Sequence, residues 1–299
     1  MTPGSRGFAL LLLSAAMLFW AGNWVIGRAL REAFEPFTLN LVRWALATLI
    51  LAPFALPALR AQAAIVRRHA GILALLALTG VSLFHALVYL GLRSTTTVNG
   101  VLLNSSLPLF ILACAWILER ERATARQVGG MLLSFAGILV ILSRGEPASL
   151  ARLEVHAGDA WILLAMPVWG VYSVLLKRRP PELGGVAFLF LIALAGTLLL
   201  LPAALLEAAS APPRWPGAEA AAGVGYIAVC ASILAFICWN RGVAIVGPSV
   251  AGFTLHLLPL FGTALAIVFL GETFRAFHAV GFATILAGVI VATRAPARG

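Results

Sequence analysis

The side chains best suited to chemistry stand in two similar sets within apolar stretches. Trp20, Asn23 and Trp24 lie at i, i+3 and i+4, which places them on one face of a helix. Trp169 and Tyr172 repeat this spacing in the second half of the chain. Aromatic faces bind aromatic rings and cations, and an amide forms hydrogen bonds with polar groups. The sets therefore favour the binding of a small molecule, with helix packing and an interfacial tryptophan belt as the alternative.

Other polar groups extend these sets. His85 and Tyr89 are four residues apart and share a helical face, and Asn104 and Ser105 lie in a later apolar stretch. His256 stands 151 positions after Ser105. A histidine in such a stretch is more often a hydrogen-bonded structural group than a ligand or proton carrier, and this alternative applies to both histidines. The predicted substrate-binding side chains are Trp20, Asn23, Trp24, His85, Tyr89, Asn104, Ser105, Trp169, Tyr172 and His256.

Catalysis and metal binding have no support in the sequence. Cys114, Cys230 and Cys238 all lie in apolar stretches, without the spacing of a metal site or of a loop disulfide. No Cys/His pair and no pair of carboxylates stands at catalytic spacing. We therefore expect no catalytic residue, no metal, no cofactor and no enzymatic activity. The cysteines are expected to be small buried apolar groups.

The composition indicates what must position these groups. The chain is 62% hydrophobic and 11% charged, with a mean hydropathy of +1.01, whereas about a quarter of the residues of a soluble globular protein are charged. An integral membrane protein follows, with the lipid bilayer as a partner. A span needs about 20 apolar residues, and the connections between spans are too short to form a soluble domain. The ten predicted spans are 8–27, 37–57, 71–92, 97–118, 127–143, 158–176, 184–205, 219–239, 249–270 and 276–293.

The chain is a duplicated unit. The run Leu107-Pro108-Leu109-Phe110 returns as Leu258-Pro259-Leu260-Phe261, and Glu121 and Gly137 also recur 151 positions later. Five spans in each half is an odd number, so the second half enters the membrane in the opposite sense from the first. We predict an all-α membrane protein whose ten transmembrane helices form two inverted five-helix repeats, residues 1–148 and 149–299.

The repeated prolines and one tryptophan are the predicted helix-break and gating residues. A proline inside a helix cannot donate to the carbonyl four residues earlier, so Pro108 and Pro259 should break their spans. Broken helices are tolerated in membranes where neighbours, water or substrate satisfy the freed carbonyl groups. A cavity wall is expected at both places, with a simple packing kink as the alternative. The predicted gate Trp239 belongs to the stretch Trp239-Asn240-Arg241, which ends its span as the pseudo-symmetric counterpart of Tyr89. An aromatic group at each mouth suits a gate, although interfacial belts explain single aromatic residues equally well.

The basic residues indicate the topology. The formal net charge is +10, and Lys and Arg lie in the short connections, thirteen on the side of the N-terminus and seven on the other side. By the positive-inside rule both termini are predicted to be cytoplasmic. Nucleic-acid binding has no domain to support it. Arg43 alone lies within a span, at a cost of about 2.5–3.5 kcal/mol, and both snorkelling to the outer headgroups and a functional role are open for it.

Two spans are expected to serve only in packing or in a dimer. Gly130 and Ser134 in span 127–143, and Ala283 and Ala287 in span 276–293, stand at four-residue spacing, which permits close contact between helices. The oligomeric state stays open, and a monomer is among the states that the sequence allows.

Short motifs at equivalent places in the two halves connect the chain to a known group of proteins. They are Arg43-Trp44-Ala45, Glu121-Arg122, Gln127-Val128-Gly129, Ala136-Gly137, Gly271-Glu272-Thr273, Gly281 and Ala287-Gly288. In their order and in the ten-span layout they resemble the drug/metabolite transporter superfamily, in its EamA-type form of two five-helix repeats. Within it the chain looks most like the inner-membrane exporters of aromatic amino acids.

This resemblance implies a central cavity formed mainly by the first, third, fourth, sixth, eighth and ninth spans, with the fifth and tenth peripheral. It also implies that some amphipathic xenobiotics pass. One departure concerns Arg120, because the family usually has glycine before the glutamate that is Glu121 here.

The predicted function is export of small metabolites, above all aromatic and other amino acids, by alternating access through a central cavity. All eleven acidic residues lie in connections or at span ends, whereas proton-coupled carriers usually use an intramembrane Asp or Glu. Facilitated export is therefore the first expectation and histidine-mediated proton coupling the second. A proton-coupled exporter of amphipathic drugs, or of a nucleoside or sugar derivative, is the alternative. Twenty arginines against one lysine, with abundant Ala and Gly, indicate a high-GC bacterial genome and hence the inner (plasma) membrane.

Overall fold

The computed structural model describes residues 4–30, 33–210, 217–270 and 273–294, and its regular elements in these ranges are all helices. Gly271 and Glu272 of the repeated motif lie outside the described residues. Ten helical segments of the described part are long and apolar enough to cross a membrane, which confirms the ten predicted spans. The largest difference in bounds is in the eighth, which runs on to Val246. The segments are Arg6–Gly27, Pro36–Ala61, Ala70–Ser94, Asn99–Glu119, Ala125–Leu142, Ala157–Arg178, Gly185–Ser210, Ala218–Val246, Pro248–Phe269 and Ala276–Thr293.

Several spans consist of more than one helical element. In the first half the elements are α1 (Arg6–Ala29), α2 (Pro36–Ala61), α3 (Ala63–Arg68), α4 (Ala70–Ala77), η2 (Leu78–Leu83), α5 (Phe84–Ser94), α6 (Thr97–Asn104), α7 (Leu107–Glu119) and α8 (Ala125–Leu142). In the second half they are η3 (Pro147–Arg152), α9 (Ala157–Leu175), η4 (Leu176–Arg178), α10 (Gly185–Ser210), α11 (Ala218–Tyr226), η5 (Ile227–Leu234), α12 (Ala235–Val246), α13 (Pro248–Phe253), η6 (Thr254–His256), α14 (Leu257–Leu270) and α15 (Ala276–Thr293).

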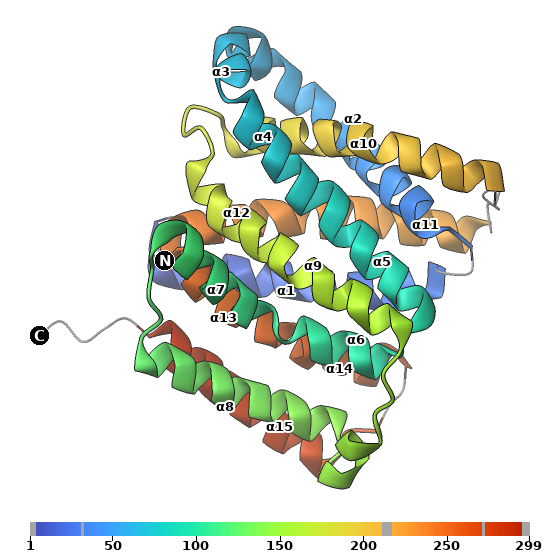
Figure 1. Cartoon of the computed structure of the whole chain (residues 1–299), viewed down its shortest axis with the longest axis vertical. Coiled ribbons are helices and arrows are strands. Elements are labelled where there is room, and N and C mark those ends of the chain that lie inside the picture. Colours follow the sequence, from blue (N-terminus) through green and yellow to red (C-terminus); the bar gives the residue numbers. More distant parts are fainter. Residues whose placement is uncertain (1–3, 31–32, 211–216, 271–272, 295–299) are drawn as a thin grey trace, which may run out of the picture.

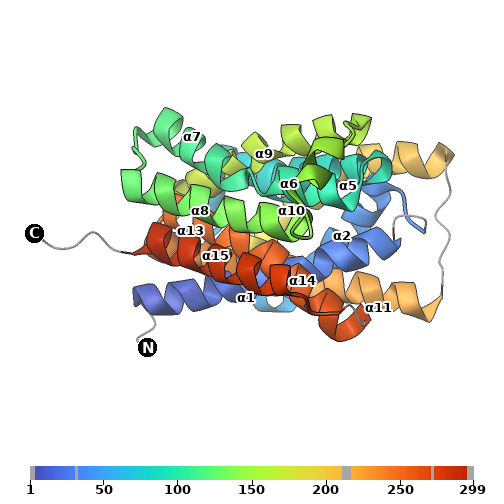
Figure 2. The ribbon, with the colours of Figure 1, turned by 90° about the horizontal axis from the view of Figure 1, so that it is seen from below.

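The long helices form one bundle with two distinct ends. Helices α2 and α10 lie along one edge and α8 and α15 along the opposite edge, with α1, α9 and α12 between them (Figure 1). Seen from below, the helices run lengthwise through the bundle (Figure 2). The Arg6 guanidinium donates a hydrogen bond to the Thr293 carbonyl, so α1 begins where α15 ends. We call this the Arg6 end and the opposite one, where Glu35 precedes α2, the Glu35 end.

The main helix pairs of the bundle each join one helix from the first half to one from the second half. Helix α2 packs against its counterpart α10, and α8 packs against its counterpart α15. Helix α1 packs against α12, and its counterpart α9 packs against α5, the counterpart of α12. Helices α1 and α9 run in opposite senses. This pairing of counterpart helices is the arrangement of two inverted repeats around a pseudo-twofold axis in the membrane plane.

The third and eighth spans both contain a π-helical segment, η2 and η5, which the sequence pattern did not indicate. The segments occupy equivalent positions and each holds a buried serine, Ser82 and Ser232. Ser82 Oγ donates to the Gly196 carbonyl at 2.9 Å, and Ser232 Oγ donates to the Ile227 carbonyl at 2.9 Å. Segments of this kind are often found at functional sites. Here η2 ends directly before Phe84.

The fourth and ninth spans are broken, as the repeated prolines predict. Helix α6 ends at Asn104 and α7 begins at Leu107, and the 3₁₀ turn η6 separates α13 from α14. The breaks precede the prolines: Pro108 and Pro259 lie in the first turns of α7 and α14. Proline is tolerated there because the first N–H groups of a helix have no intrahelical partner.

Arg120 ends α7 in the left-handed conformation, with φ 56° and ψ 21°. A residue with a Cβ pays about 1–2 kcal/mol for this conformation, and glycine adopts it freely. The glycine that the resemblance led us to expect at this position would fit this backbone. This chain adopts the left-handed conformation with an arginine.

Helices α8 and α15 pack through glycines. A methyl group on Gly130 would lie 2.5 Å from the Ala292 backbone nitrogen and 2.6 Å from the Gly288 carbonyl oxygen, so the two backbones touch here. The expected small-residue contact is confirmed for α8. For α15 the predicted residues were wrong: Ala283 and Ala287 face outward, and Gly281 and Gly288 make the contact. Glycine permits the closest approach because it lacks a Cβ.

Gly130→Val should lower the free energy of unfolding by about 1–3 kcal/mol, since the added side chain forces two packed helices apart. Gly129 is the matched control, because a methyl group there would meet nothing within 4 Å. The melting temperature of each purified variant in detergent measures the effect. Equal losses for Gly129→Val and Gly130→Val would contradict the packing described.

Candidate functional site

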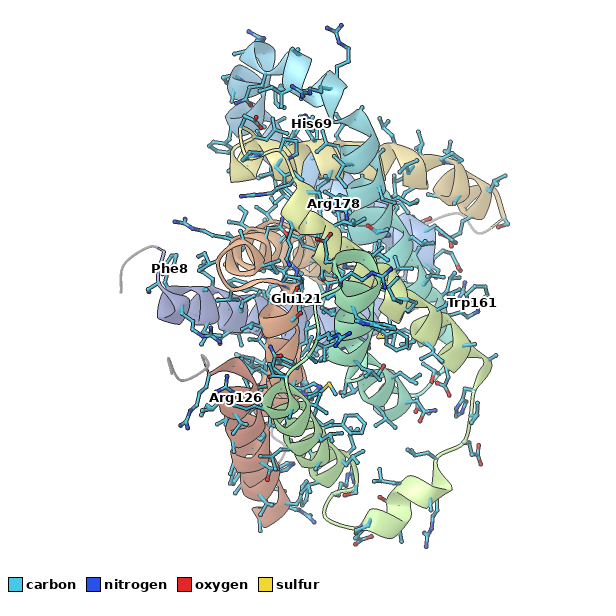
Figure 3. The ribbon with its side chains drawn as sticks, turned by 60° about the vertical axis from the view of Figure 1, so that its left-hand side comes forward. Phe8, His69, Glu121, Arg126, Trp161 and Arg178 are labelled. Atoms are coloured by element: carbon cyan, nitrogen blue, oxygen red, sulfur yellow. The ribbon has the colours of Figure 1, made fainter. Side chains whose placement is uncertain are left out.

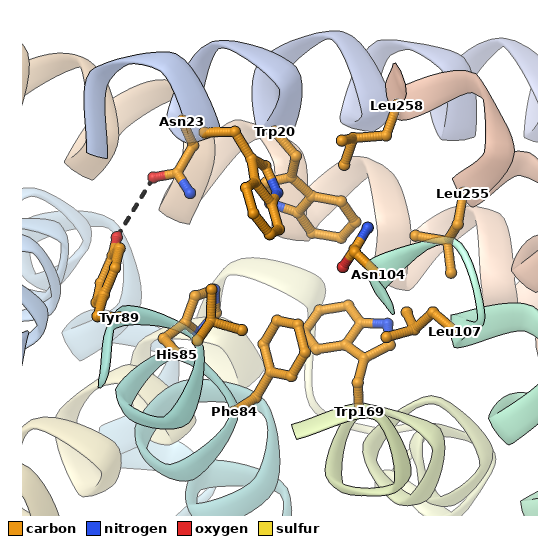
Figure 4. Close-up of a pocket in the computed structure, with 12 residues that line it drawn as sticks. Trp20, Asn23, Phe84, His85, Tyr89, Asn104, Leu107, Trp169, Leu255 and Leu258 are labelled. Atoms are coloured by element: carbon orange, nitrogen blue, oxygen red, sulfur yellow. Dashed lines mark hydrogen bonds between the residues drawn. The ribbon is translucent and has the colours of Figure 1, made fainter. Parts of the chain in front are cut away.

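A cavity lies in the centre of the bundle, where helices of both halves meet (Figure 4). Its volume is about 40 Å³, and since a water needs about 10–15 Å³ of such space, it has room for a few waters. The lining comes from α1, α5, α6, α7, α9, η6 and α14. The lining residues are Trp20, Asn23, Trp24, Phe84, His85, Val88, Tyr89, Asn104, Leu107, Trp169, Leu255 and Leu258.

The cavity straddles the pseudo-twofold axis of the fold. Asn104 and Leu255 are equivalent positions of the two halves, 151 residues apart, and both line it. The same holds for Leu107 and Leu258, which precede the repeated prolines. Trp20 and its counterpart Trp169 face each other across the cavity, with ring centroids 5.2 Å apart. Inverted-repeat transporters bind their substrates at such an interface, next to discontinuous helices.

Aromatic rings close the cavity toward the Arg6 end. Phe84 lies 4.7 Å from Trp169, measured between ring centroids, and Figure 4 shows both rings on the same wall. The ring centroid of Trp239 lies 5.5 Å from that of Trp20 and 5.8 Å from that of Trp169. Trp239, the predicted gate, is thus fully buried against two tryptophans of the cavity rather than exposed at an interface.

The structure brings seven of the ten predicted binding residues to the cavity. These are Trp20, Asn23, Trp24, His85, Tyr89, Asn104 and Trp169. The other three, Ser105, Tyr172 and His256, do not line it. Tyr172 packs against Trp169 on the side of the Arg6 end, with ring centroids 5.0 Å apart.

His256 and Ser105 contact each other. His256 Nε2 lies 2.9 Å from the Ser105 carbonyl oxygen, and Nδ1 forms a hydrogen bond with Ser134 of α8. The carbonyl can only accept, so Nε2 carries a proton and donates. The imidazole thereby satisfies a carbonyl at the break between α6 and α7 and ties it to the equivalent break, η6.

Sequence reasoning missed five lining residues: Phe84, Val88, Leu107, Leu255 and Leu258. All are apolar and lie in apolar stretches, so residue type gave no signal. Two signals were present nonetheless. Leu107 and Leu258 belong to the repeated Leu-Pro pair, and Leu255 is the counterpart of Asn104.

Two equivalent tyrosine–asparagine pairs lie on either side of the cavity. Toward the Glu35 end, the Tyr89 hydroxyl lies 3.5 Å from Asn23 Oδ1. Toward the Arg6 end, the Tyr172 hydroxyl donates to Asn240 Oδ1 at 2.7 Å. Asn23 is the counterpart of Tyr172, 149 positions earlier, and Tyr89 that of Asn240, 151 positions earlier. The two halves therefore contribute the same pair with the residues exchanged, and the pair at the Arg6 end is the tighter one.

Arg43 reaches the pair at the Glu35 end. Its side chain is fully buried, with Nη1 donating to the Tyr89 hydroxyl at 2.8 Å and Nε to Ser232 Oγ at 2.9 Å. Its guanidinium carbon also lies 5.2 Å from the Trp44 ring centroid. Of the two interpretations left open by the sequence, snorkelling is thus wrong: the charge points into the bundle.

Ion pairs join helices at both ends. At the Arg6 end, Lys177 Nζ lies 2.9 Å from Glu121 Oε2, and Arg178 Nη2 lies 2.7 Å from Glu119 Oε1. Glu121 follows the end of α7 and Arg178 ends η4, and Figure 3 shows Trp161 of α9 lying away from Arg178 toward the other end of the bundle. At the Glu35 end, Arg93 pairs with Glu35. These pairs are partly exposed to solvent, and such pairs contribute about 0–1 kcal/mol each.

Comparison with known proteins agrees with this architecture. The chain is 29% identical to an uncharacterized transporter of Archaeoglobus fulgidus, over 95% of this chain and 96% of that protein. It is 28% identical to a probable terminal-alkyne amino-acid exporter of Streptantibioticus cattleyicolor, over 96% and 93%. A protein of known crystal structure has the same fold, with a TM-score of 0.75, 21% identity and 97% of each chain covered.

The pattern of one family matches each half separately. The EamA-like transporter family matches residues 7–143 and again residues 156–294, which together make up most of the chain. The two matched ranges correspond to the two inverted repeats of the structure. The chain is therefore a member of the EamA-like transporter family, a family of membrane transporters within the drug/metabolite transporter superfamily.

Proposed function

We propose that this transporter exports aromatic and other amino acids by alternating access through the central cavity. The observation that carries the proposal is the composition of the cavity wall. Trp20, Trp169 and Phe84 present aromatic surface, and Asn23 and Asn104 present amides on the same space. An aromatic ring gains from burial and from edge-to-face contact with such a wall. The similarity to an amino-acid exporter supports the same substrate class.

The size of the cavity supports a mechanism in which the walls move. A volume of about 40 Å³ is too small for an amino acid, so the walls must separate before substrate enters. The two tyrosine–asparagine pairs lie where such a separation would break bonds. One state would open between Asn23 and Tyr89, and the other between Tyr172 and Asn240. The inverted repeats make these two openings structurally equivalent.

The basic residues support one orientation in the membrane. Lys177, Arg178 and Arg126 lie at the Arg6 end, and by the positive-inside rule such residues favour the cytoplasmic side. We propose that the Arg6 end faces the cytoplasm of a bacterial inner membrane and that the Glu35 end releases the substrate. Each of the two pairs lies within one half, so the motion would separate α1 from α5 in residues 1–148 and α9 from α12 in residues 149–299.

Expression in living cells tests the proposed substrate class. Cells that express the chain should survive p-fluorophenylalanine, a toxic phenylalanine analogue, at concentrations that stop cells carrying an empty vector. Their content of labelled phenylalanine should fall in parallel, because export lowers the internal concentration. Equal survival and equal phenylalanine content in the two strains would contradict export of aromatic amino acids.

A proton-coupled carrier is the second candidate, and one observation favours it. His85 lines the cavity, and its Nδ1 has no hydrogen-bond partner among the described residues. His256, by contrast, has partners on both ring nitrogens. A proton carried through the protein would therefore use His85, with amphipathic drugs or another metabolite class as the alternative cargo.

We expect facilitated transport, because every described acidic residue lies in a connection or near the end of its helix. An imposed proton gradient should then leave net phenylalanine uptake into proteoliposomes unchanged. A pH-sensitive dye inside the vesicles measures proton movement during the same experiment. Proton uptake that accompanies phenylalanine and disappears in His85→Gln would reverse the expectation.

A further inference from the structure

Arg43 is a buried cation without a carboxylate partner among the described residues. Its side chain is fully buried, and it donates hydrogen bonds to two neutral hydroxyl groups, those of Tyr89 and Ser232. In the described part of the chain its Nη2 has no hydrogen-bond partner. A permanent charge inside a membrane protein costs about 2.5–3.5 kcal/mol even on the most lenient scale, and buried charges are normally paired. A third partner is therefore missing from this site.

Three acidic residues at the Glu35 end form contacts with groups other than Arg43. Glu35 pairs with Arg93, and Glu207 accepts the Thr38 backbone N–H at 2.7 Å. Asp159 accepts from the Asn99 side chain at 2.8 Å. Arg43 takes part in none of the ion pairs between described residues. The missing anion is thus not supplied by the described part of the chain.

The cavity wall beside Arg43 presents donors. The Tyr89 hydroxyl accepts from Arg43, so its own proton points to the other side, where Asn23 lies on the cavity. Trp169 also lines the cavity, and its buried Nε1 has no hydrogen-bond partner among the residues that the structure describes. An indole nitrogen can only donate. A ligand that satisfies these groups must bring acceptors.

We infer that Arg43 and Tyr89 form the recognition site for a substrate carboxylate. The inference rests on the proposed function and deepens it, because it names the residues that would recognise the carboxylate group of the substrate. The Tyr89–Asn23 contact of 3.5 Å is longer than the two hydrogen bonds that Arg43 donates, at 2.8 and 2.9 Å, and is therefore the easiest to replace. A substrate carboxylate takes the place of Asn23 and accepts hydrogen bonds from the Tyr89 hydroxyl and from Arg43 Nη2. The carboxylate end then lies toward the Glu35 end, and the side chain of the substrate lies between Trp20 and Trp169.

Wild-type protein tests this directly, without any variant that could fail to fold. Competition against labelled phenylalanine is measured on purified protein with three analogues: 3-phenylpropionate, which keeps the carboxylate, and phenethylamine and phenylalaninamide, which lack it. We expect 3-phenylpropionate to compete at least about tenfold better than either cation, since hydrogen bonds to charged groups are the strong ones. Equal competition by phenethylamine would overturn the inference.

Variants locate the site. Arg43→Gln should weaken phenylalanine binding at least about tenfold and abolish the preference for acids, whereas Arg43→Lys, which keeps the charge, should retain the preference. Arg152→Gln is the matched control, because Arg152 is exposed on η3. A monodisperse elution profile shows that each variant is folded. If Arg43→Gln kept both affinity and preference, another group would hold the carboxylate and the inference would be wrong.

The two proposals fail differently. If the proposed function is wrong, no amino acid binds to the wild-type protein. The inference is then tested separately, by measuring whether labelled 3-phenylpropionate binds directly. Binding of that acid with dependence on Arg43 would support a carboxylate site for another class of organic acid. Its absence would end the inference as well. Amino-acid binding with no preference for the carboxylate would end the inference alone.

Discussion

Trp169→Ala should reduce substrate transport at least about tenfold. The Trp169 ring is 2% exposed and lies between Trp20, Phe84 and Tyr172, with ring centroids 4.7 to 5.2 Å apart. It forms the wall on which the substrate ring would rest, and aromatic pairs contribute about 0.5–1.5 kcal/mol each beyond the area that they bury. The measurement is the initial rate of phenylalanine counterflow in proteoliposomes, at equal amounts of reconstituted protein.

Two further variants separate binding from folding. Loss of a buried indole also costs about 3–5 kcal/mol of stability, so Trp169→Phe, which keeps an aromatic ring, should restore part of the rate. Trp161 lies on the same helix α9, two turns away, and is 44% exposed on the outside of the bundle (Figure 3). Trp161→Ala should leave the rate unchanged. Unchanged counterflow in a folded Trp169→Ala variant would remove the aromatic wall from the mechanism.

Tyr172→Phe should shift the transporter toward the state that is open at the Arg6 end. The substitution deletes the 2.7 Å bond to Asn240 and leaves a buried oxygen without a donor. Such a loss costs about 1–3 kcal/mol, or roughly five- to 150-fold in an equilibrium between two states. Only the state closed at the Arg6 end has this bond, so only that state is destabilised.

Alkylation of a buried reporter measures the shift. Ser173 is fully buried one residue beyond Tyr172, so a cysteine at this position should react with a maleimide only when the Arg6 end opens. The three native cysteines are first replaced by alanine. Tyr172→Phe should raise the reaction rate about tenfold, and Tyr226→Phe, which removes a 3.2 Å bond to the Phe19 carbonyl away from the cavity, should not. Equal rates for all three backgrounds would exclude a gating role for the Tyr172–Asn240 pair.

The sequence predicted the architecture well because apolar runs and repeated residues can be recognised along the chain without knowledge of its contacts. Ten apolar runs of span length are ten spans in the structure, and the recurrence of Pro108 as Pro259 marks two real breaks. Aromatic residues at helical spacing, such as Trp20 and Trp24, indeed face the cavity. The helical period alone determines which side chains share a face.

What the sequence could not predict depends on contacts between distant segments. Arg43 could be placed in a span, but only packing shows that it meets Tyr89 and Ser232. His256 was expected in the cavity, and it is instead hydrogen-bonded at the break, 151 positions from Ser105. The contact face of α15 was predicted wrongly because small residues lie on more than one face of this helix, and only the packing against α8 shows which of them make the contact.

Counterflow in proteoliposomes that contain the purified chain tests the central claim most directly. Vesicles loaded with unlabelled phenylalanine are diluted into labelled phenylalanine, tryptophan or threonine, at matched pH on both sides. The account predicts saturable exchange of the two aromatic amino acids without any imposed gradient, because one cavity is presented to each side in turn. Exchange of threonine alone, or no exchange until a proton gradient is imposed, would contradict an aromatic cavity that works by facilitated alternating access.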